Sequence, residues 1–196
     1  MSVWMEVGIG IVIIMGGVWL VKTVMGWNLY RKSIYTEIYS NYFEYAFRAK
    51  KREKLSVSSY FRSRFGNHRI YYQIVQKKNE KYPQAYVVII LSSGLYIMNI
   101  KNQQNQSRNP MEECKAFTKK ICDKIGADSL RIVQMVVYPE NSKGWEGKPD
   151  KQILVIRRKQ MFETLKMDFE RNAKAMSDEQ IEQLYQAISR ESDRSA

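Results

Sequence analysis

Residues 86–104 read YVVIILSSGLYIMNIKNQQ, and this stretch decides the fold. Two apolar runs, 86–91 and 95–100, flank the letters SSG, which are typical of a tight turn between antiparallel strands. Both runs are almost continuously hydrophobic, as expected of strands that are buried on both faces. We therefore predict a buried β-hairpin whose second strand ends at a single basic residue, Lys101.

Helical and extended segments alternate on either side of this hairpin. The other predicted strands are 69–75, 130–138 and 152–158. The predicted helices are 28–65, with a break near 54–59, and then 109–126, 159–175 and 177–188. Helices that separate and follow strands favour one α/β domain with a mixed central sheet flanked by helices.

Two of the predicted helices carry recognisable terminal residues. Asn109 precedes Pro110, and Gly126 closes the same segment, as is typical of an N-cap, a first helical position and a helix end. Ser177 and Gln180 have the spacing of a capping box. The starts of these two helices are therefore predicted to the residue.

The N-terminal segment has the composition of a transmembrane helix. Residues 7–21 read VGIGIVIIMGGVWLV without a polar interruption, and TVMGW follows Lys22 up to residue 27. As one helix, residues 7–27 extend roughly 30 Å, the thickness of a hydrocarbon core. A cleaved signal peptide is the alternative, but no basic residue precedes the apolar run and no A-x-A-like site follows it.

Basic residues behind this segment predict its orientation. Arg31 and Lys32 follow at once, and RAKKREK occupies 48–54, so the positive-inside rule places the C-terminal side in the cytoplasm. The expected location is the cell membrane, with a single pass and a cytoplasmic soluble domain. The predicted parts are an extracytoplasmic stub (1–6), a transmembrane helix (7–27), juxtamembrane and first domain helices (28–65), an α/β core (66–190) and a disordered tail (191–196).

The charge of the chain predicts an anionic neighbour. The formal net charge is +12, and Lys22 and Glu6 are the only charged residues before residue 28. The excess therefore lies in the soluble part and favours nucleic acid or an anionic leaflet. The candidate nucleic-acid-binding or lipid-binding residues are Arg48, Lys50, Lys51, Arg52, Lys54, Arg62, Arg64 and Arg69.

Lipid and nucleic acid remain alternatives for these basic residues. Juxtamembrane lysines and arginines gain roughly 1 kcal/mol each beside anionic lipid, which favours lipid for the cluster nearest the membrane. Nucleic acid is the alternative because aromatic residues on which bases stack interleave with the cations. These aromatic residues are Tyr60, Phe61, Tyr71 and Tyr72.

The scarcity of histidine and cysteine excludes several kinds of site. His68 is the only histidine, which leaves little for a Ser-His-Asp triad. Cys114 and Cys122 are eight residues apart on a predicted helix, about 12 Å along its axis, too far for a disulfide. Neither cysteine has a partner at zinc-ligand spacing, so both are expected to be reduced core residues.

The order of these segments resembles the NERD (nuclease-related) domain family. The hairpin with its Ser-Gly turn and Lys-Asn ending, the Asn-Pro helix start, the strand IVQMVVY and the final helix MSDEQIEQLYQAI follow one another as in that family. The resemblance covers roughly residues 33–190 and implies a restriction-endonuclease-like fold. It also implies a site in which two carboxylates hold a divalent cation beside a lysine, with a glutamate from the first helix.

Carried over by position, this site is degenerate. The first-helix glutamate falls on Glu37, the lysine on Lys101, and the two metal-binding carboxylates on Tyr86 and Asn99. A tyrosine would have to lose a proton of pKa about 10 to bind a metal, and an asparagine offers only a neutral carbonyl. The glutamine that the family has after Asn-Pro is here Glu113.

The resemblance therefore implies a catalytically inactive pseudo-nuclease without a cofactor. We expect it to bind an unidentified protein partner or nucleic acid at the membrane. Lys101 is expected to reach into solvent from the strand end, with phosphate binding as the alternative, and Glu37 to be a plain surface residue. Acidic side chains that converge on Lys101 would overturn this interpretation.

Two other hypotheses stay open. One is an active Mg²⁺-dependent nuclease whose carboxylates have moved, for instance to Glu37 with Glu44 or Glu113. The other is an unrelated membrane-tethered α/β domain, for which the fold alone would give no function.

Overall fold

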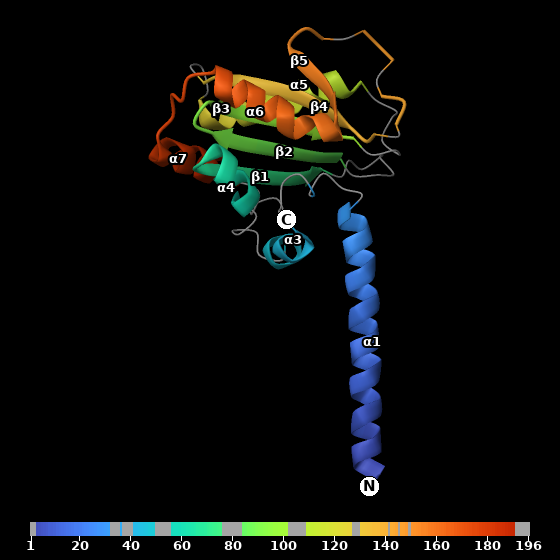
Figure 1. Cartoon of the computed structure of the whole chain (residues 1–196). Helices are drawn as coiled ribbons and strands as arrows, with labels where there is room; N and C mark the ends of the chain where they lie inside the picture. The colour runs from blue at the N-terminus through green and yellow to red at the C-terminus, as the bar shows by residue number, and fades with distance from the viewer. Residues whose placement is uncertain are drawn as a thin grey trace.

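The computed structural model places most of the chain in an α/β domain, from which one long helix extends (Figure 1). The described residues are 3–31, 36, 41–49, 56–75, 84–101, 109–126, 130–140, 142–144, 146–148 and 150–190. Within them, a five-stranded mixed sheet is flanked by helices, which confirms the predicted fold class at this level. The predicted tail at 191–196 lies outside the described residues.

The elements lie close to the predicted segments. The helices are α1 (Val3–Arg31), α3 (Tyr42–Ala49), α4 (Ser59–Phe65), α5 (Pro110–Ile125), the short 3-10 helix η2 (Arg158–Gln160), α6 (Met161–Arg171) and α7 (Asp178–Ser189). The strands are β1 (His68–Val75), β2 (Gln84–Leu91), β3 (Gly94–Ile100), β4 (Ile132–Tyr138) and β5 (Ile153–Arg157).

The sheet runs in the order β1-β2-β3-β4-β5, the same as the order along the chain. β1, β2 and β3 form an antiparallel meander, and β4 and β5 continue the sheet in parallel pairing. The predicted hairpin is β2–β3, with Leu91 opposite Gly94. Gly94 has a φ of 146°, and a Cβ at this position would lie 2.6 Å from the carbonyl oxygen of Arg131. Both the turn and the close approach of β4 therefore require glycine here.

Each face of the sheet has its own hydrophobic core. Side chains of α4 and α6 cover one face, around Met98 of β3. Side chains of α5 and α7 cover the other, around Ile97. Neighbouring residues of β3 thus serve opposite layers, because side chains alternate along a strand. This alternation places Asn99 and Lys101 on the face that α5 covers.

Local sequence determines the starts of α5 and α7 as predicted. The Asn109 side chain accepts a hydrogen bond from the Met111 amide, and α5 ends at Gly126 in the left-handed conformation. The Ser177 side chain accepts from the Gln180 amide, and the Gln180 side chain accepts in return from the Ser177 amide. Both predicted caps are confirmed, and the structure also has the two cysteines as free thiols.

The predicted helical segment 28–65 is interrupted before α3, in addition to the break that was predicted near 54–59. α1 continues to Arg31, and α3 and α4 are separate short helices. Before α4, Ser58 is extended, with φ −118° and ψ 133°, and its amide donates to Nε2 of His68 at 3.0 Å. Ser58 lies within the break predicted near 54–59, which is confirmed at this residue, and the hydrogen bond to His68 holds it in the extended conformation.

α1 carries the predicted transmembrane segment. Across the parts of the chain with described placement, no helix combines the length and the apolar character required of a membrane span. The transmembrane assignment of residues 7–27 therefore stays a prediction.

Candidate functional site

A buried ion pair lies at the end of β3, at the predicted position of the vestigial site. The ammonium of Lys101 donates to Oε2 of Glu113, from the first turn of α5. The two side chains are only 2% and 6% exposed. The expectation that Lys101 reaches into solvent is wrong, because α5 packs over the end of β3 and offers a carboxylate within the core.

Neutral polar side chains surround the Glu113 carboxylate. Gln84, at the start of β2, donates through Nε2 to Oε1 at 2.6 Å. Asn99 donates through Nδ2 to Oε2 at 3.4 Å and to the Pro110 carbonyl oxygen at 3.3 Å. The carboxylate therefore accepts from Gln84, Asn99 and Lys101, which is how a buried charge is stabilised.

Tyr86 belongs to the same cluster. Its hydroxyl donates to Oε1 of Gln84 at 2.6 Å, and its ring stacks on Phe117 with centroids 4.1 Å apart. Tyr86 and Asn99 are direct partners across β2 and β3. The register of the hairpin thus brings together the two positions at which the resembling family has carboxylates.

The electrostatics of this polar cluster (Gln84, Tyr86, Asn99, Lys101 and Glu113) keep the carboxylate ionised. Burial is the largest influence and would raise the pKa of Glu113, but the hydrogen bond and positive charge of Lys101 act against it. Hydrogen bonds from Gln84 and Asn99 add to the lowering, and the net pKa lies below the ordinary value of 4.5. The positive charge of Lys101 therefore balances the negative charge of Glu113 within this salt bridge.

One acceptor of the cluster has no hydrogen-bond partner among the described residues. Oδ1 of Asn99 is buried without a hydrogen bond, although Nδ2 of the same amide donates twice. Nearby, the Cys114 thiol donates to the Met135 carbonyl oxygen at 3.6 Å. Burial raises the pKa of this thiol to about 11, so it is a poor nucleophile.

The structure brings together three of the four carried-over positions, Tyr86, Asn99 and Lys101. Glu37 lies outside the described residues. The contact of Glu113 with Lys101 was not predicted, although a sequence signal existed. Glu113 lies four residues before Phe117, on the apolar stripe of α5, where a carboxylate needs a buried partner.

The donor set does not match a divalent-cation site. Within the described residues, no three histidine, cysteine, aspartate or glutamate side chains come close enough to hold a metal ion together. At the polar cluster, Glu113 is the carboxylate against Lys101, and the other oxygens belong to neutral amides and a phenol. Mg²⁺ prefers several hard oxygen ligands with carboxylates among them.

The predicted basic residues do not gather at this cluster. Arg62 and Arg64 are exposed on α4, and the guanidinium of Arg64 lies 4.7 Å from the centre of the Tyr60 ring. Arg69 forms an ion pair with Glu182 of α7 at 2.6 Å, and this ion pair links β1 to α7. Arg48 belongs to α3, but its side chain and residues 50–54 lie outside the described part.

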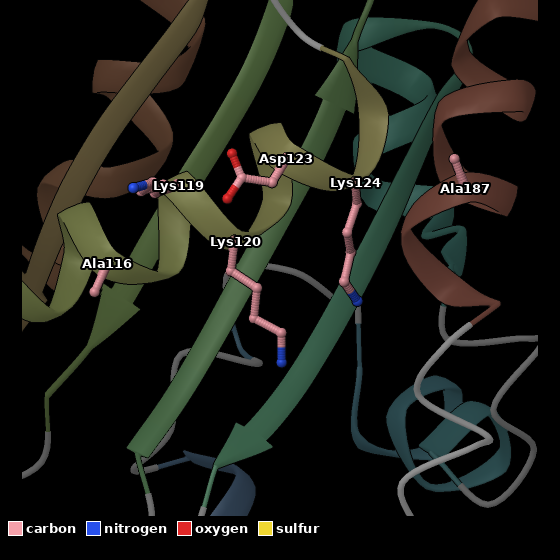
Figure 2. A pocket seen from close by; sticks show the side chains of 6 residues that line it. All are labelled: Ala116, Lys119, Lys120, Asp123, Lys124 and Ala187. Carbon is pink, nitrogen blue, oxygen red and sulfur yellow. The ribbon is translucent and has the colours of Figure 1, made fainter.

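A lysine-lined groove between α5 and α7 was not predicted. It has a volume of about 640 Å³ and is lined by Ala116, Lys119, Lys120, Asp123, Lys124 and Ala187. Figure 2 shows the side chains of Lys120 and Lys124 extending in the same direction from α5. Three cations beside one carboxylate make this groove attractive to anions.

Comparisons with known proteins supply no relative. Neither a family model, nor a curated protein, nor a solved structure matches the chain.

Proposed function

We propose that the chain is a membrane-anchored, non-catalytic module with a degenerate nuclease-like fold, which binds a protein partner or nucleic acid at the inner face of the membrane. The observation that carries the proposal is the buried Lys101–Glu113 pair: one carboxylate does converge on Lys101, but Lys101 neutralises it, and the several acidic side chains that would overturn the interpretation are not gathered there in the described part of the chain. A nuclease of this kind needs a free lysine and carboxylates that hold a metal. Here the lysine and the carboxylate are bound to each other.

Burial argues further against catalysis at the polar cluster. A general acid or base must come within hydrogen-bond reach of the reacting atom. The ammonium of Lys101 is almost fully covered, and both oxygens of Glu113 already accept hydrogen bonds. A phosphodiester would have to displace α5 before it met either group.

The sheet supports the nuclease-like part of the proposal. An antiparallel β2–β3 hairpin continues into parallel β4 through α5, and the polar cluster lies where β3 ends beneath this helix. This agrees with the element order that the NERD resemblance implies.

The side chains of α1 support the membrane-anchored part. Apolar residues along its length are exposed to solvent in the isolated chain. They are Val12, Ile13, Ile14, Met15, Val18, Trp19, Leu20, Val21, Val24 and Met25. Exposed apolar surface of this extent calls for a bilayer or a partner, and the following cations favour a cytoplasmic domain.

Cleavage assays test the proposal. The full-length protein in lipid nanodiscs is incubated with Mg²⁺ or Mn²⁺ and with single- and double-stranded DNA and RNA. The expected result is no cleavage above that of Lys101→Ala, prepared identically. Cleavage that depends on metal and disappears in Lys101→Ala would refute the pseudo-nuclease.

A second candidate is a metal-dependent nuclease that uses Glu113. The contact between this carboxylate and Lys101 favours it, because one acidic group does converge on the lysine. The two candidates differ in metal binding. Mg²⁺ or Mn²⁺ that raises the melting temperature of the wild type but not of Glu113→Gln would support the nuclease, and no shift in either protein would support the pseudo-nuclease.

Affinity capture from the native membrane, with and without nuclease treatment, separates the two kinds of partner. Partners lost after nuclease treatment indicate nucleic acid, and partners retained indicate protein. The lysine-lined groove supplies a matched pair of variants: Lys120→Glu reverses a charge inside it, and Lys159→Glu reverses one outside it. Only Lys120→Glu is expected to weaken the capture of an anionic partner.

A further inference from the structure

The short helix α3 packs against the end of α1. A Cβ at Gly26 would collide with the hydroxyl of Tyr42, so α3 approaches α1 where α1 has no side chain. One turn further along α1, Tyr30 lies with its ring 5.9 Å from that of Tyr42 and stacks at 5.3 Å on Tyr45. These contacts hold α3 beside the last turns of α1, rather than on the sheet alone.

Next to this packed side, α3 carries the exposed apolar side chain of Phe43. Tyr42 and Tyr45 face the core cluster that contains Tyr30, whereas Phe43 is 60% exposed. Outside α1, the large apolar side chains exposed to this degree are few in the described part of the chain, and Phe43 is the one that lies next to α1. A single exposed phenylalanine is ordinary by itself, but beside the exposed apolar surface of α1 it can enter the same apolar environment as that helix.

α3 lies beside the part of α1 that carries an aromatic and a basic side chain, Trp27 and Arg31. Trp27, the residue after Gly26, is 46% exposed, and the guanidinium of Arg31 lies 4.7 Å from its ring centre. Tryptophan and arginine at the end of an apolar helix are typical of the membrane–water interface. Since Tyr42 meets α1 at Gly26, α3 lies at the level of these two side chains.

The orientation of α3 fits the plane of a bilayer. Figure 1 shows α3 viewed along its axis, close to the upper end of α1, which extends lengthwise in the same view. The two axes therefore cross steeply. A helix that crosses a membrane-spanning helix in this way lies along the membrane surface, with its apolar side chains in the boundary between headgroups and acyl chains.

We propose that α3 is an interfacial helix and that a lipid bilayer is the partner of its exposed face. Phe43 enters the headgroup–acyl boundary beside Trp27, while Tyr42 and Tyr45 bind α3 to α1. The proposal rests on the membrane anchor proposed above for α1. Its consequence is that the domain has a fixed orientation on the membrane, because two helices at different angles contact the bilayer.

Spin labels at three positions of the full-length chain test this proposal. Phe43→Cys reports on α3, Val18→Cys on the middle of α1, and Met167→Cys on an exposed apolar residue of α6 away from α1. The background is Cys122→Ser, since buried Cys114 reacts poorly. Each protein is reconstituted in nanodiscs, and collision rates with oxygen and with a water-soluble nickel chelate are measured. Unchanged urea midpoints establish that each variant is folded.

Oxygen concentrates in the bilayer and the nickel chelate in water, so their ratio reports depth. We expect oxygen-to-nickel ratios at positions 18 and 43 that are several-fold higher than the ratio at 167. A low ratio at 18 overturns the anchor and the inference together. A high ratio at 18 with equal ratios at 43 and 167 leaves the anchor intact and overturns the inference. Protection of position 43 from both reagents means that protein covers Phe43, and it also overturns the inference.

Discussion

Two ion pairs bracket β3 on opposite faces of the sheet. At its end, Lys101 and Glu113 are 2% and 6% exposed beneath α5. Beside its start, Arg131, the residue before β4, binds Asp168 of α6 through two hydrogen bonds of 2.7 and 2.6 Å, and these side chains are 37% and 21% exposed. Both pairs link the sheet to a covering helix, but only the second one remains in contact with water.

Each pair also has a tyrosine, and the two tyrosines differ in role. The Tyr96 hydroxyl donates to Asp168 at 2.7 Å, and burial, followed by this hydrogen bond, raises its pKa to about 12. The Tyr86 hydroxyl donates to Gln84, and Gln84 in turn donates to Glu113. Around Asp168, the tyrosine and the arginine both contact the carboxylate directly. Around Glu113, the tyrosine is connected to the carboxylate through a chain of hydrogen bonds.

Burial, more than geometry, therefore determines how much the free energy of unfolding falls when one partner of an ion pair is removed. An exposed pair loses little, because water replaces the missing partner. A buried pair contributes little beyond an apolar replacement, yet the loss of one partner leaves a charge without compensation.

The largest expected effect is that of Glu113→Ala. It leaves the ammonium of Lys101 and the amide of Gln84 without their acceptor, so the free energy of unfolding should fall by about 3–5 kcal/mol. Urea unfolding of the full-length protein in detergent micelles measures this. The double variant Lys101→Met with Glu113→Leu removes both charges and should lose much less. An equal loss in both proteins would contradict the argument.

The next effect is the pH dependence of stability. The folded-state pKa of Glu113 lies below its ordinary 4.5, so its contribution is fully present above pH 4.5 and is lost as pH falls through the folded value. The wild type should therefore lose more stability on acidification from pH 5 than the double variant Lys101→Met with Glu113→Leu. Urea unfolding midpoints of both proteins, measured from pH 5 downwards, test this prediction. The same decrease of the midpoint with pH in both proteins would contradict it.

Asp168→Asn should have a smaller effect, with a loss of about 1 kcal/mol at neutral pH. The amide keeps an acceptor for Tyr96 but loses the charge opposite Arg131. The same urea titration measures it, with Arg131→Gln as the matched variant from the other side. A loss as large as that of Glu113→Ala would erase the distinction between the two pairs.

The smallest effect is expected for Lys115→Met. Lys115 binds Asp150, which is at the surface, so the pair is screened by water. Its urea midpoint should match that of the wild type within error. A clear loss of stability would mean that exposure does not decide the cost.

The sequence predicted those parts of the fold that local chemistry decides. Asn109, Pro110 and the Ser177 capping box fix the starts of α5 and α7 through residues within one turn. The SSG turn likewise fixes the β2–β3 register. In the segment 28–65 the break before α4 was predicted, but the interruption before α3 was not, because α3 packs back on α1 through Tyr42 and Tyr30, a contact that periodicity does not show.

Three members of the polar cluster, Tyr86, Asn99 and Lys101, were identified from the sequence, whereas Gln84 and the ion pair between Lys101 and Glu113 were not. Register alone brings Tyr86 opposite Asn99, two residues before Lys101. Whether Lys101 meets water or a carboxylate depends on how α5 packs on β3, which is a long-range property. The position of Glu113 on the apolar stripe of α5 indicates a buried carboxylate, but the sequence does not show which cation pairs with it.

The strand order β1-β2-β3-β4-β5 has a consequence for how the protein is made. Each strand is synthesised directly after the strand with which it will pair, so the sheet can grow by the addition of strands at one edge. No strand pair that has already formed has to open for this. α7 is synthesised after all five strands and packs against β1, the first strand of the sheet, where Arg69 pairs with Glu182. We therefore expect a nascent chain arrested before α7 to expose the apolar side of β1 until that helix has been synthesised.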